Sequence, residues 1–188
     1  MDFHTFDADD ADRLEEAGER YRFLSREELL YHLDPGESSV LADLGSGTGF
    51  FTDEVAPHAQ KVYAIDVQPE MHEYYRGKGV PSNVDLVTAN AETLPFDDAE
   101  LDGVFSTMTF HEVASSAALT ELARVMTPEG RIVIVDWSKE GSGEAGPPID
   151  ERFTSEEASN KLRDAGFDIE TSLTRFETFI ITGVRRTS

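Results

Sequence analysis

The segment VLADLGSGTGFFT, residues 40–52, decides the fold of this chain of 188 residues. An apolar strand, residues 40–42, leads into the glycine-rich turn at residues 43–49, and a helical pattern begins at Phe50. Glycines at such a junction let the backbone approach a ligand closely and leave a helix N-terminus facing it. The segment therefore predicts a strand, a ligand-binding turn and a helix, in that order.

Further apolar or β-branched segments follow along the chain, most of them separated by helical patterns. The expected strands are residues 40–44, 62–66, 84–88, 101–106 and 131–137, and the expected helices are residues 50–56, 69–76, 115–126 and 155–165. Alternating strands and helices imply right-handed crossovers and a parallel sheet. The last two segments, 168–175 and 177–185, leave no room for a helix and should pair antiparallel. We expect a three-layer α/β/α sandwich whose seven-stranded, mostly parallel sheet ends in an antiparallel C-terminal hairpin.

The organisation of the chain is predicted to be a helical cap, residues 1–39, followed by one core domain, residues 40–188. Leucines and aromatic residues separated by charges predict one or two amphipathic helices before the stop at Asp34-Pro35-Gly36. The sequence TPEG at residues 127–130 is expected to end the preceding helix. The stretch GSGEAGPP, residues 141–148, is typical of a loop.

The charge balance is extreme, with 38 acidic and 16 basic side chains and a formal net charge of -22. Such a field repels nucleic-acid backbones and anionic lipid head groups, so neither is expected as a partner. The acidic residues are scattered along the whole chain. Our hypothesis is a halophilic protein with an acidic surface, adapted to a salt-rich cytoplasm; an acidic mesophilic protein is the alternative.

No apolar run approaches the roughly 18 residues that a membrane span needs. The first ten residues, MDFHTFDADD, contain four aspartates and lack the basic and apolar stretches of a targeting signal. On these grounds we expect a cytoplasmic protein.

The absence of cysteine excludes disulfides, thiolate metal sites and cysteine nucleophiles. The five histidines, His4, His32, His58, His72 and His111, show no ligand spacing. No metal site is therefore expected.

A carboxylate, Asp66, ends the strand that follows the glycine-rich turn. At this place a carboxylate can accept hydrogen bonds from both ribose hydroxyls, which indicates a nucleoside ligand; a tight turn beside an exposed acid is the alternative. Dinucleotides are disfavoured because their G-x-G-x-x-G fingerprint needs glycine where this chain has Phe50. A phosphate-binding loop is disfavoured because no Lys-Ser or Lys-Thr follows the glycines. Asp43 would repel a diphosphate but suits a cationic group such as an ammonium or sulfonium, directly or through water.

The segment LADLGSGTGFFT, residues 41–52, resembles the glycine-rich signature of class I S-adenosylmethionine-dependent methyltransferases. VYAIDVQPEM (62–71), NAETLPFDDAELDGVFS (90–106) and LTELARVMTPEGRIVIVD (119–136) resemble later blocks of that family, in the same order. The general sequence pattern of these blocks is similar to that of the small-molecule branch related to ubiquinone and menaquinone biosynthesis methyltransferases. The resemblance covers about residues 40–136, and more loosely the final hairpin. It implies a Rossmann-like fold, S-adenosyl-L-methionine as cofactor and a small-molecule acceptor.

The resemblance also implies individual roles in cofactor binding. The residues implied are Asp43, Gly45, Ser46, Gly47 and Gly49 around the methionine part, Asp66 at the ribose, Val67 and Met71 beside the adenine ring, Asn90, Ala91 and Glu92 at its edge, and Thr107 after the fourth strand. Core packing is the alternative interpretation of Met71, because methionine commonly fills gaps. A surface charge is the alternative interpretation of Glu92.

The candidate catalytic residue is His111, in the segment STMTFHE that follows the fourth strand. Methyl transfer needs mainly alignment, and it needs a base only where the nucleophile holds a proton. His111 can act as that base with Glu112 orienting it; the alternative is a histidine that hydrogen-bonds locally at a helix start. The Asn/Asp-Pro-Pro-aromatic tetrapeptide of enzymes that methylate exocyclic amines of nucleic acids is missing here, which disfavours such substrates.

The acceptor is expected to lie under the N-terminal helices, with Tyr21, Phe23 and Tyr31, and under the loop at residues 137–153. The same aromatics can instead seal the core. Because the chain has little extra cap, we expect a monomer or homodimer whose site is open or completed by a partner.

Two other functions stay open from the sequence. One is a protein that binds S-adenosylmethionine or S-adenosylhomocysteine for sensing or scaffolding without catalysis. The other is a nicotinamide-dependent oxidoreductase, against which Phe50 argues.

Overall fold

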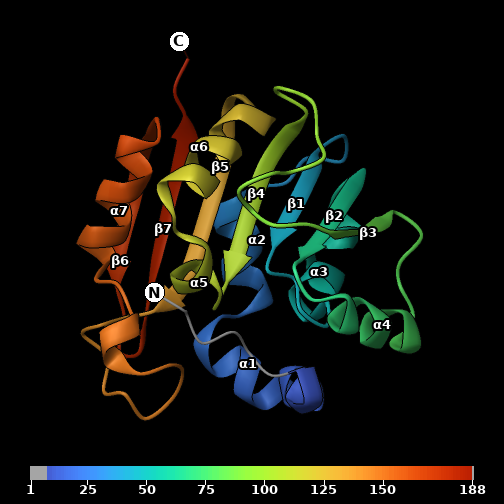
Figure 1. Cartoon of the computed structure of the whole chain (residues 1–188), viewed down its shortest axis with the longest axis horizontal. Helices are drawn as coiled ribbons and strands as arrows, with labels where there is room; N and C mark the ends of the chain where they lie inside the picture. The colour runs from blue at the N-terminus through green and yellow to red at the C-terminus, as the bar shows by residue number, and fades with distance from the viewer. Residues whose placement is uncertain (1–7, 188) are drawn as a thin grey trace.

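The described residues, 8–187 of a computed structural model, form a seven-stranded sheet with helices on both faces (Figure 1). The strand order is β3-β2-β1-β4-β5-β7-β6. The strands are β1 (Val40–Leu44), β2 (Lys61–Asp66), β3 (Val84–Thr88), β4 (Leu101–Thr107), β5 (Met126–Trp137), β6 (Phe167–Thr174) and β7 (Thr178–Arg185). The first five strands are parallel, and β7 is antiparallel to both of its neighbours. The predicted fold class is confirmed; residues 1–7, with His4, lie outside the described residues.

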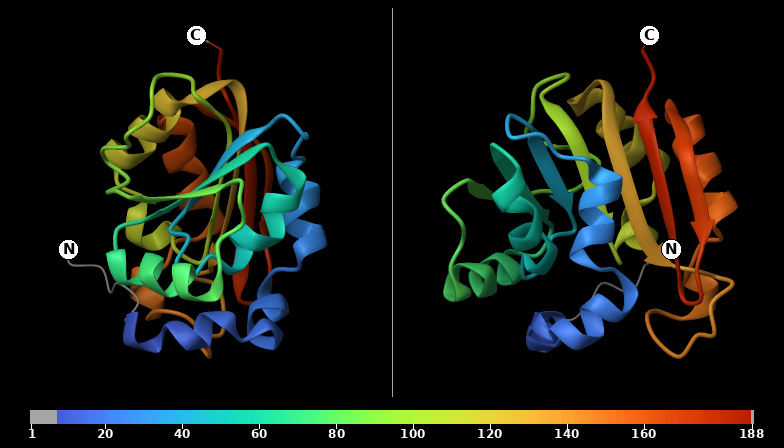
Figure 2. Two further views of the ribbon diagram at one scale, coloured as in Figure 1. Left: turned by 90° about the vertical axis from the view of Figure 1, so that its right-hand side faces the viewer. Right: turned by 180° about the vertical axis from the view of Figure 1, so that it is seen from behind.

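The helices complete three layers, as the two further views make plain (Figure 2). They are η1 (Ala8–Glu15), α1 (Ala17–Phe23), α2 (Arg26–Leu33), α3 (Phe50–Val55), η2 (Ala56–His58), α4 (Pro69–Lys78), α5 (Phe110–Val113), α6 (Ser116–Val125), η3 (Ile149–Glu151) and α7 (Ser155–Asp164), where η denotes a 3₁₀ helix.

Alternation along β5 assigns the helices to the two faces of the sheet. Val133 and Val135 belong to a core cluster that also contains buried hydrophobic side chains of α2, α3 and α4. Ile132 and Ile134 belong to the cluster formed with α5, α6 and α7. Successive strand residues point to opposite faces, so each cluster fills one side of the sheet. Burial on both faces explains why this strand is a continuous apolar run in the sequence.

The residues TPEG, expected to lie between the helix and the next strand, instead lie within β5. The helix α6 ends at Val125, and Met126 already pairs with Leu101 of β4. Arg131 then pairs with Gly103, so residues 127–130 bulge out of the ladder between these two pairs. Within this bulge Glu129 has a φ of 64°, and a Cβ added to Gly130 would lie 2.8 Å from the carbonyl oxygen of Thr127.

The described N-terminal region contains two α-helices, α1 and α2, within the predicted number, and the 3₁₀ helix η1 precedes them. Leu24 and Ser25 are extended, which separates α1 from α2, and the Ser25 hydroxyl caps α2 by accepting from the Glu28 amide at 3.1 Å. Helix α1 buries none of its residues, whereas α2 buries Leu29 and Leu33 against the sheet. The boundary at residue 39 stays a prediction.

The helices of the opposite face begin with side-chain caps. The Ser115 hydroxyl accepts from the Ala118 amide at 3.1 Å at the start of α6. Thr154 and Glu157 form a reciprocal capping box at the start of α7. Among residues 8–187, the helices are all too short or too polar to cross a membrane.

Candidate functional site

The glycine-rich turn is bonded to the end of the neighbouring strand β2. The amides of Gly45 and Ser46 both donate to the carbonyl oxygen of Ile65, at 2.8 and 2.9 Å. The amide of Gly47 donates to Oδ2 of Asp66 at 2.8 Å. These bonds fix the turn at the carboxyl edge of the sheet, where open α/β sheets bind their ligands.

Two glycines of the turn are required by space as well as by backbone conformation. Gly45 has a φ of 76°, and a Cβ there would lie 2.3 Å from the side chain of Thr109. Gly49 has a φ of 81°, and its Cβ would lie 2.0 Å from the ring of Tyr75. Left-handed conformations of this kind favour glycine. The turn is therefore packed tightly against Thr109 and Tyr75 at these two glycines.

A cavity of about 1080 Å³ lies along this edge of the sheet. It is lined by eleven of the predicted site residues: Gly45, Ser46, Gly47, Asp66, Val67, Met71, Asn90, Ala91, Glu92, Thr107 and His111. Asp43 and Gly49 are not part of its lining. Gly49 contacts Tyr75 instead, so its place in the turn is explained by packing.

Asp66 is 8% exposed and is held by two backbone amides. Its Oδ2 accepts from Gly47, and its Oδ1 accepts from Gln68 at 2.9 Å. Each carboxylate oxygen has a second lone pair, so both can still accept from a ligand. The residue is thus both a brace for the turn and a hydrogen-bond acceptor at the cavity.

Asp43 lies behind the turn and is fully buried. The Thr52 hydroxyl donates to its Oδ2 at 2.6 Å, and its Oδ1 is buried without a hydrogen-bond partner among the described residues. Burial raises the pKa of this carboxyl to about 7, although Thr52 and the charge of Arg20 act in the opposite direction.

Arg20 of α1 lines the cavity and is a site residue that the sequence analysis missed. Its guanidinium lies 5.0 Å from the ring centroid of Phe51, and its Nε is buried without a partner among residues 8–187. Burial lowers the pKa of Arg20, and the charge of Asp43 opposes this effect. In the sequence, Arg20 is one of several charges on an amphipathic helix, with no signal of its own.

Around the turn, three buried polar atoms lack a hydrogen-bond partner in the part of the chain that the structure describes: Nε of Arg20, Oδ1 of Asp43 and Oγ of Ser46. Buried polar groups are normally hydrogen-bonded, so these atoms call for a partner. A cation, an anion and a hydroxyl together suit a zwitterionic group such as an α-amino carboxylate. This donor set fits the methionine part of S-adenosylmethionine.

The predicted adenine side of the cavity combines one buried and one exposed apolar residue. Met71 is 1% exposed and belongs to α4, whereas Val67 is 57% exposed. Oε1 of Glu92 accepts from the Ser115 hydroxyl at 2.7 Å, and the Glu92 amide donates to Oδ1 of Asn90 at 2.9 Å. Glu92 is therefore fixed at the edge of the cavity by neighbours from two segments.

His111 is paired with Asp136, the penultimate residue of β5. Nδ1 of His111 lies 3.0 Å from both carboxylate oxygens of Asp136, and the His111 amide donates to Oδ2 at 2.6 Å. Oε1 of Glu112 lies 3.7 Å from the other ring nitrogen, Nε2. The prediction that Glu112 orients the imidazole is wrong, because Asp136 holds it. The sequence signal for Asp136 is its position near the end of a buried strand, at the edge of the sheet where ligands bind.

Burial alone would lower the pKa of His111. The hydrogen bond to Asp136 and the negative charges of Asp136, Glu112 and Glu151 outweigh burial, so the pKa of the imidazole lies above its usual value. Asp136 is itself fully buried, and it also accepts from the Trp137 amide at 2.8 Å.

The expected acceptor side is lined by Phe23 of α1, by Trp137 and by residues 144–147 of the following loop. The rings of Phe23 and Trp137 meet edge to face, 4.7 Å between centroids. Tyr31 is 80% exposed and does not line the cavity. Of the three N-terminal aromatics expected here, only Phe23 takes the expected place in this cavity.

The loop at residues 144–147, which forms this wall of the cavity, is held by the buried side chain of Arg152. The Arg152 guanidinium donates to the carbonyl oxygens of Pro147, Ser138 and Ala145. It also lies 5.7 Å from the ring centroid of Trp137. The conformation of the loop is therefore fixed by hydrogen bonds from Arg152.

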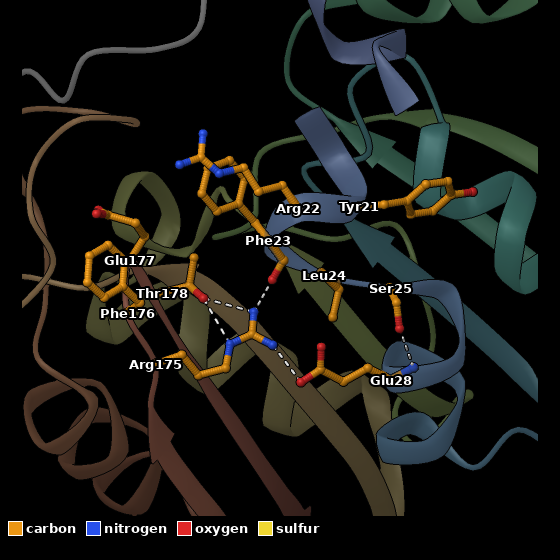
Figure 3. A pocket seen from close by; sticks show the side chains of 10 residues that line it. All are labelled: Tyr21, Arg22, Phe23, Leu24, Ser25, Glu28, Arg175, Phe176, Glu177 and Thr178. Carbon is orange, nitrogen blue, oxygen red and sulfur yellow. Dashed lines mark hydrogen bonds and ion pairs between the residues drawn. The ribbon is translucent and has the colours of Figure 1, made fainter. Parts of the chain in front are cut away.

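A smaller cavity, about 340 Å³, lies beside the first at the junction of α1 and α2 (Figure 3). In its centre the guanidinium of Arg175, from the turn between β6 and β7, donates to the Phe23 carbonyl oxygen, the Thr178 hydroxyl and the Glu28 carboxylate. Tyr21 lines this smaller cavity, and Phe23 lines both. Arg175 thus fixes the junction from which α1 extends over the large cavity.

Within residues 8–187, no group of three histidine, aspartate or glutamate side chains is arranged to hold a metal ion.

Comparisons with known proteins agree with this geometry. Residues 42–134 match the family model described as "Methyltransferase domain". An uncharacterized methyltransferase-like protein of Schizosaccharomyces pombe is 37% identical over 103 residues, which cover 54% of this chain and 39% of that protein. A ubiquinone/menaquinone biosynthesis C-methyltransferase of Pasteurella multocida is 37% identical over 106 residues, which cover 52% of this chain and 39% of that protein. The chain thus matches less than half the length of these two curated relatives.

A solved structure matches nearly the whole chain. The crystal structure of an S-adenosylmethionine-dependent methyltransferase from Aquifex aeolicus superposes with a TM-score of 0.85 and is 30% identical. The match covers 96% of this chain and 99% of that one.

Proposed function

The chain belongs to the class I S-adenosylmethionine-dependent methyltransferases, and on this premise we propose that it transfers a methyl group from S-adenosylmethionine to a small-molecule acceptor. The observation that carries the proposal is the pairing of the glycine-rich turn with Asp66 at the large cavity. Together they offer a binding site for a nucleoside at the edge of the sheet. The turn lacks the third glycine of a dinucleotide site, since Phe50 occupies that position.

The methionine part would be held by the turn and by the three unsatisfied atoms around it. Arg20 would bind the carboxylate, Asp43 would face the ammonium group through water, and Ser46 would supply a hydroxyl. Asp66 would accept from the ribose hydroxyls with its remaining lone pairs. When bound, the cofactor supplies a methyl group activated by a positively charged sulfur.

The adenine ring would lie between Val67 and Met71, with Asn90, Ala91 and Glu92 at its edge. Glu92 has one carboxylate oxygen bonded to Ser115, which leaves the other to accept from the exocyclic amine. The exposed side chain of Val67, which contacts little protein, is explained by a ring that covers it.

The acceptor would occupy the end of the cavity between His111, Phe23 and the loop at residues 144–147. The net charge of -22 supports a small molecule over a nucleic acid. We propose a monomer or a homodimer. In either state we propose that His111 accepts a proton from the nucleophile where the nucleophile carries one.

Incubation with methyl-labelled S-adenosylmethionine and a panel of hydroxyl, amine, thiol, carboxylate and carbon acceptors tests this function. Label transfer to at least one acceptor, with release of S-adenosylhomocysteine, is expected. Cofactor binding without transfer to any acceptor would instead favour a sensing or scaffolding protein.

A further inference from the structure

We propose that Glu15 and Lys78 are positioning residues of the cofactor site: together they hold the N-terminal segment η1 against the glycine-rich turn as a movable wall, which the cofactor displaces when it enters and leaves. This inference rests on the proposed function, because it takes the large cavity as the place where S-adenosylmethionine binds. It is carried by the contacts that the carboxylate of Glu15 makes with the turn and with α4.

The segment η1 lies directly against the turn that is proposed to hold the cofactor. Arg13 and Leu14 of η1 line the large cavity together with Gly47 and Thr48 of the turn. A Cβ added to Gly47 would lie 3.3 Å from Cδ1 of Leu14, so the leucine packs on the turn itself. The segment lies beside α4 at the bottom of Figure 1, and it forms one wall of the cavity at its cofactor end.

Apolar packing contributes little to the position of η1. Among residues 11–15, Ala11 is the only buried side chain, and Leu14 is half-buried where it faces the cavity. Stabilisation by burial scales with the apolar area removed from water, which is small for alanine. A segment with so few buried apolar contacts can open locally at a low cost in free energy.

Polar contacts from two residues of η1 reach the turn and α4. The carboxylate of Glu15 accepts from the buried Thr48 hydroxyl in the turn, and both of its oxygens lie 3.0 Å from Nζ of Lys78 on α4. The carboxylate of Asp12 accepts from the Tyr74 hydroxyl of α4 at 2.7 Å. One side chain, Glu15, thus ties η1 both to the turn and to the neighbouring helix.

Lys78 separates two carboxylates at this contact. Its Nζ lies 3.0 Å from Glu15 and 3.0 Å from Oδ2 of Asp53 on α3. The side chains of Lys78, Glu15 and Asp53 are 22%, 27% and 36% exposed, and ion pairs that reach solvent are of modest strength. Without the lysine, the two carboxylates would face each other and repel. The position of η1 therefore depends on the charge of Lys78.

A movable wall has a kinetic signature of its own. If the cofactor passes only while η1 is open, association and release both go through the open state, and both rate constants rise with its population. A side chain that only contributes affinity changes mainly the release rate constant. Faster association on loss of a contact therefore distinguishes the movable wall from ordinary support of the binding site.

Rapid filtration of the full chain with radiolabelled S-adenosylhomocysteine measures both rate constants, association on mixing and release on addition of excess unlabelled compound. Lys78→Met should raise both by about threefold to tenfold, as expected for the loss of part-exposed ion pairs and the new repulsion between two carboxylates. Lys78→Arg keeps the cation and should keep both rate constants close to those of the unmodified chain. The matched control is Lys139→Met, which removes a lysine that lies 3.9 Å from Glu157 and does not line the cavity, and it should change neither.

Glu15→Gln should act in opposite directions in two backgrounds. In the unmodified chain it weakens the contact with Lys78, so both rate constants should rise. In Lys78→Met it removes the repulsion between Glu15 and Asp53, so both should fall below those of Lys78→Met alone. The amide oxygen of glutamine can still accept from Thr48, so this reversal reports the charge of the side chain.

Rate constants of Lys78→Met that equal those of the unmodified chain would overturn this inference and leave the proposed function intact. Release that speeds up while association does not would also overturn it, as would a change in the same direction by Glu15→Gln in both backgrounds. Failure of S-adenosylhomocysteine to bind to the unmodified chain would overturn the proposed function itself.

Discussion

The backbone amide of Gly47 donates a 2.8 Å hydrogen bond to Oδ2 of Asp66, so the glycine-rich turn and the acid after the second strand hold each other in place. From the sequence, the two features indicated one ligand independently. In the fold they form one unit, because the carboxylate that faces the cavity also accepts an amide of the turn. Ligand binding and local stability are therefore linked at this acid.

Replacement of Asp66 by alanine should weaken S-adenosylmethionine binding by about 1 to 3 kcal/mol, the scale for losing hydrogen bonds to a charged group. The same change leaves the amides of Gly47 and Gln68 without their acceptor, so the melting temperature should fall as well. Calorimetric titration below the melting temperature, together with thermal unfolding, measures both effects.

Asp66→Asn keeps one acceptor oxygen and should lose less stability than alanine. Asp164→Ala, an exposed acid at the end of α7, is the control for a lost negative charge. An unchanged affinity of Asp66→Ala for S-adenosylmethionine would show that Asp66 does not bind this ligand.

Gly49→Ala should lower the free energy of unfolding by about 2 kcal/mol or more, because left-handed strain and overpacking each typically cost 1 to 3 kcal/mol. The added Cβ would lie 2.0 Å from the buried ring of Tyr75. Gly18→Ala in α1, where no atom of the described residues lies within 4 Å of the added Cβ, should be neutral or slightly stabilising. Urea unfolding of the two variants makes the comparison. Equal stability would show that Tyr75 yields to the methyl group.

The buried carboxyl of Asp43 should make stability depend on pH. Its pKa is raised from 3.8 to about 7 in the fold, chiefly by burial. Between these values the native state holds more protons than the unfolded state, so this group's contribution to stability falls as pH rises through that window. Each unit of the shift corresponds to about 1.4 kcal/mol.

Asp43→Asn removes this ionisation and keeps an oxygen that can accept from Thr52. The variant should gain stability relative to the unmodified chain as pH rises from 4 to 8, as measured by urea unfolding across that range. It should also bind S-adenosylmethionine more weakly at pH 8, because the cation loses its carboxylate. A stability difference that does not change with pH would show that Asp43 ionises normally.

The net charge of -22 should make the protein more stable in salt. Screening by potassium chloride relieves the repulsion among the carboxylates. The melting temperature should therefore rise from low to molar potassium chloride, as adaptation to a salt-rich cytoplasm requires. A flat or falling curve would contradict that adaptation.

The sheet was predictable because its strands are marked by local patterns. Continuous apolar runs such as residues 132–135 reflect burial on both faces, and Pro and Gly mark the breaks. The position of residues 127–130 was not predictable, since their inclusion in β5 depends on the pairing of Met126 with Leu101 across the sheet. The same local sequence, TPEG, is compatible with a turn that ends a helix and with a bulge within a strand.

The cofactor side of the site was predictable to the extent that it is continuous in sequence. The turn and Asp66 both belong to the unit β1-α3-β2, in which they follow β1 and end β2, so their order alone brings them together. Arg20 was missed because it reaches the turn only through packing of α1 against Phe51. Asp136 was missed because its partner, His111, lies on a different element, α5, and an acidic neighbour in the sequence, Glu112, offered a simpler pair.

Calorimetric titration of the unmodified chain with S-adenosylmethionine, S-adenosylhomocysteine and NAD, each in turn, shows which cofactor the glycine-rich turn binds. We expect both sulfur nucleosides to bind at one site per chain and NAD to give no binding heat, because Phe50 replaces the glycine that a dinucleotide needs. Binding of NAD without either sulfur nucleoside would contradict the assignment of the chain as an S-adenosylmethionine-dependent methyltransferase.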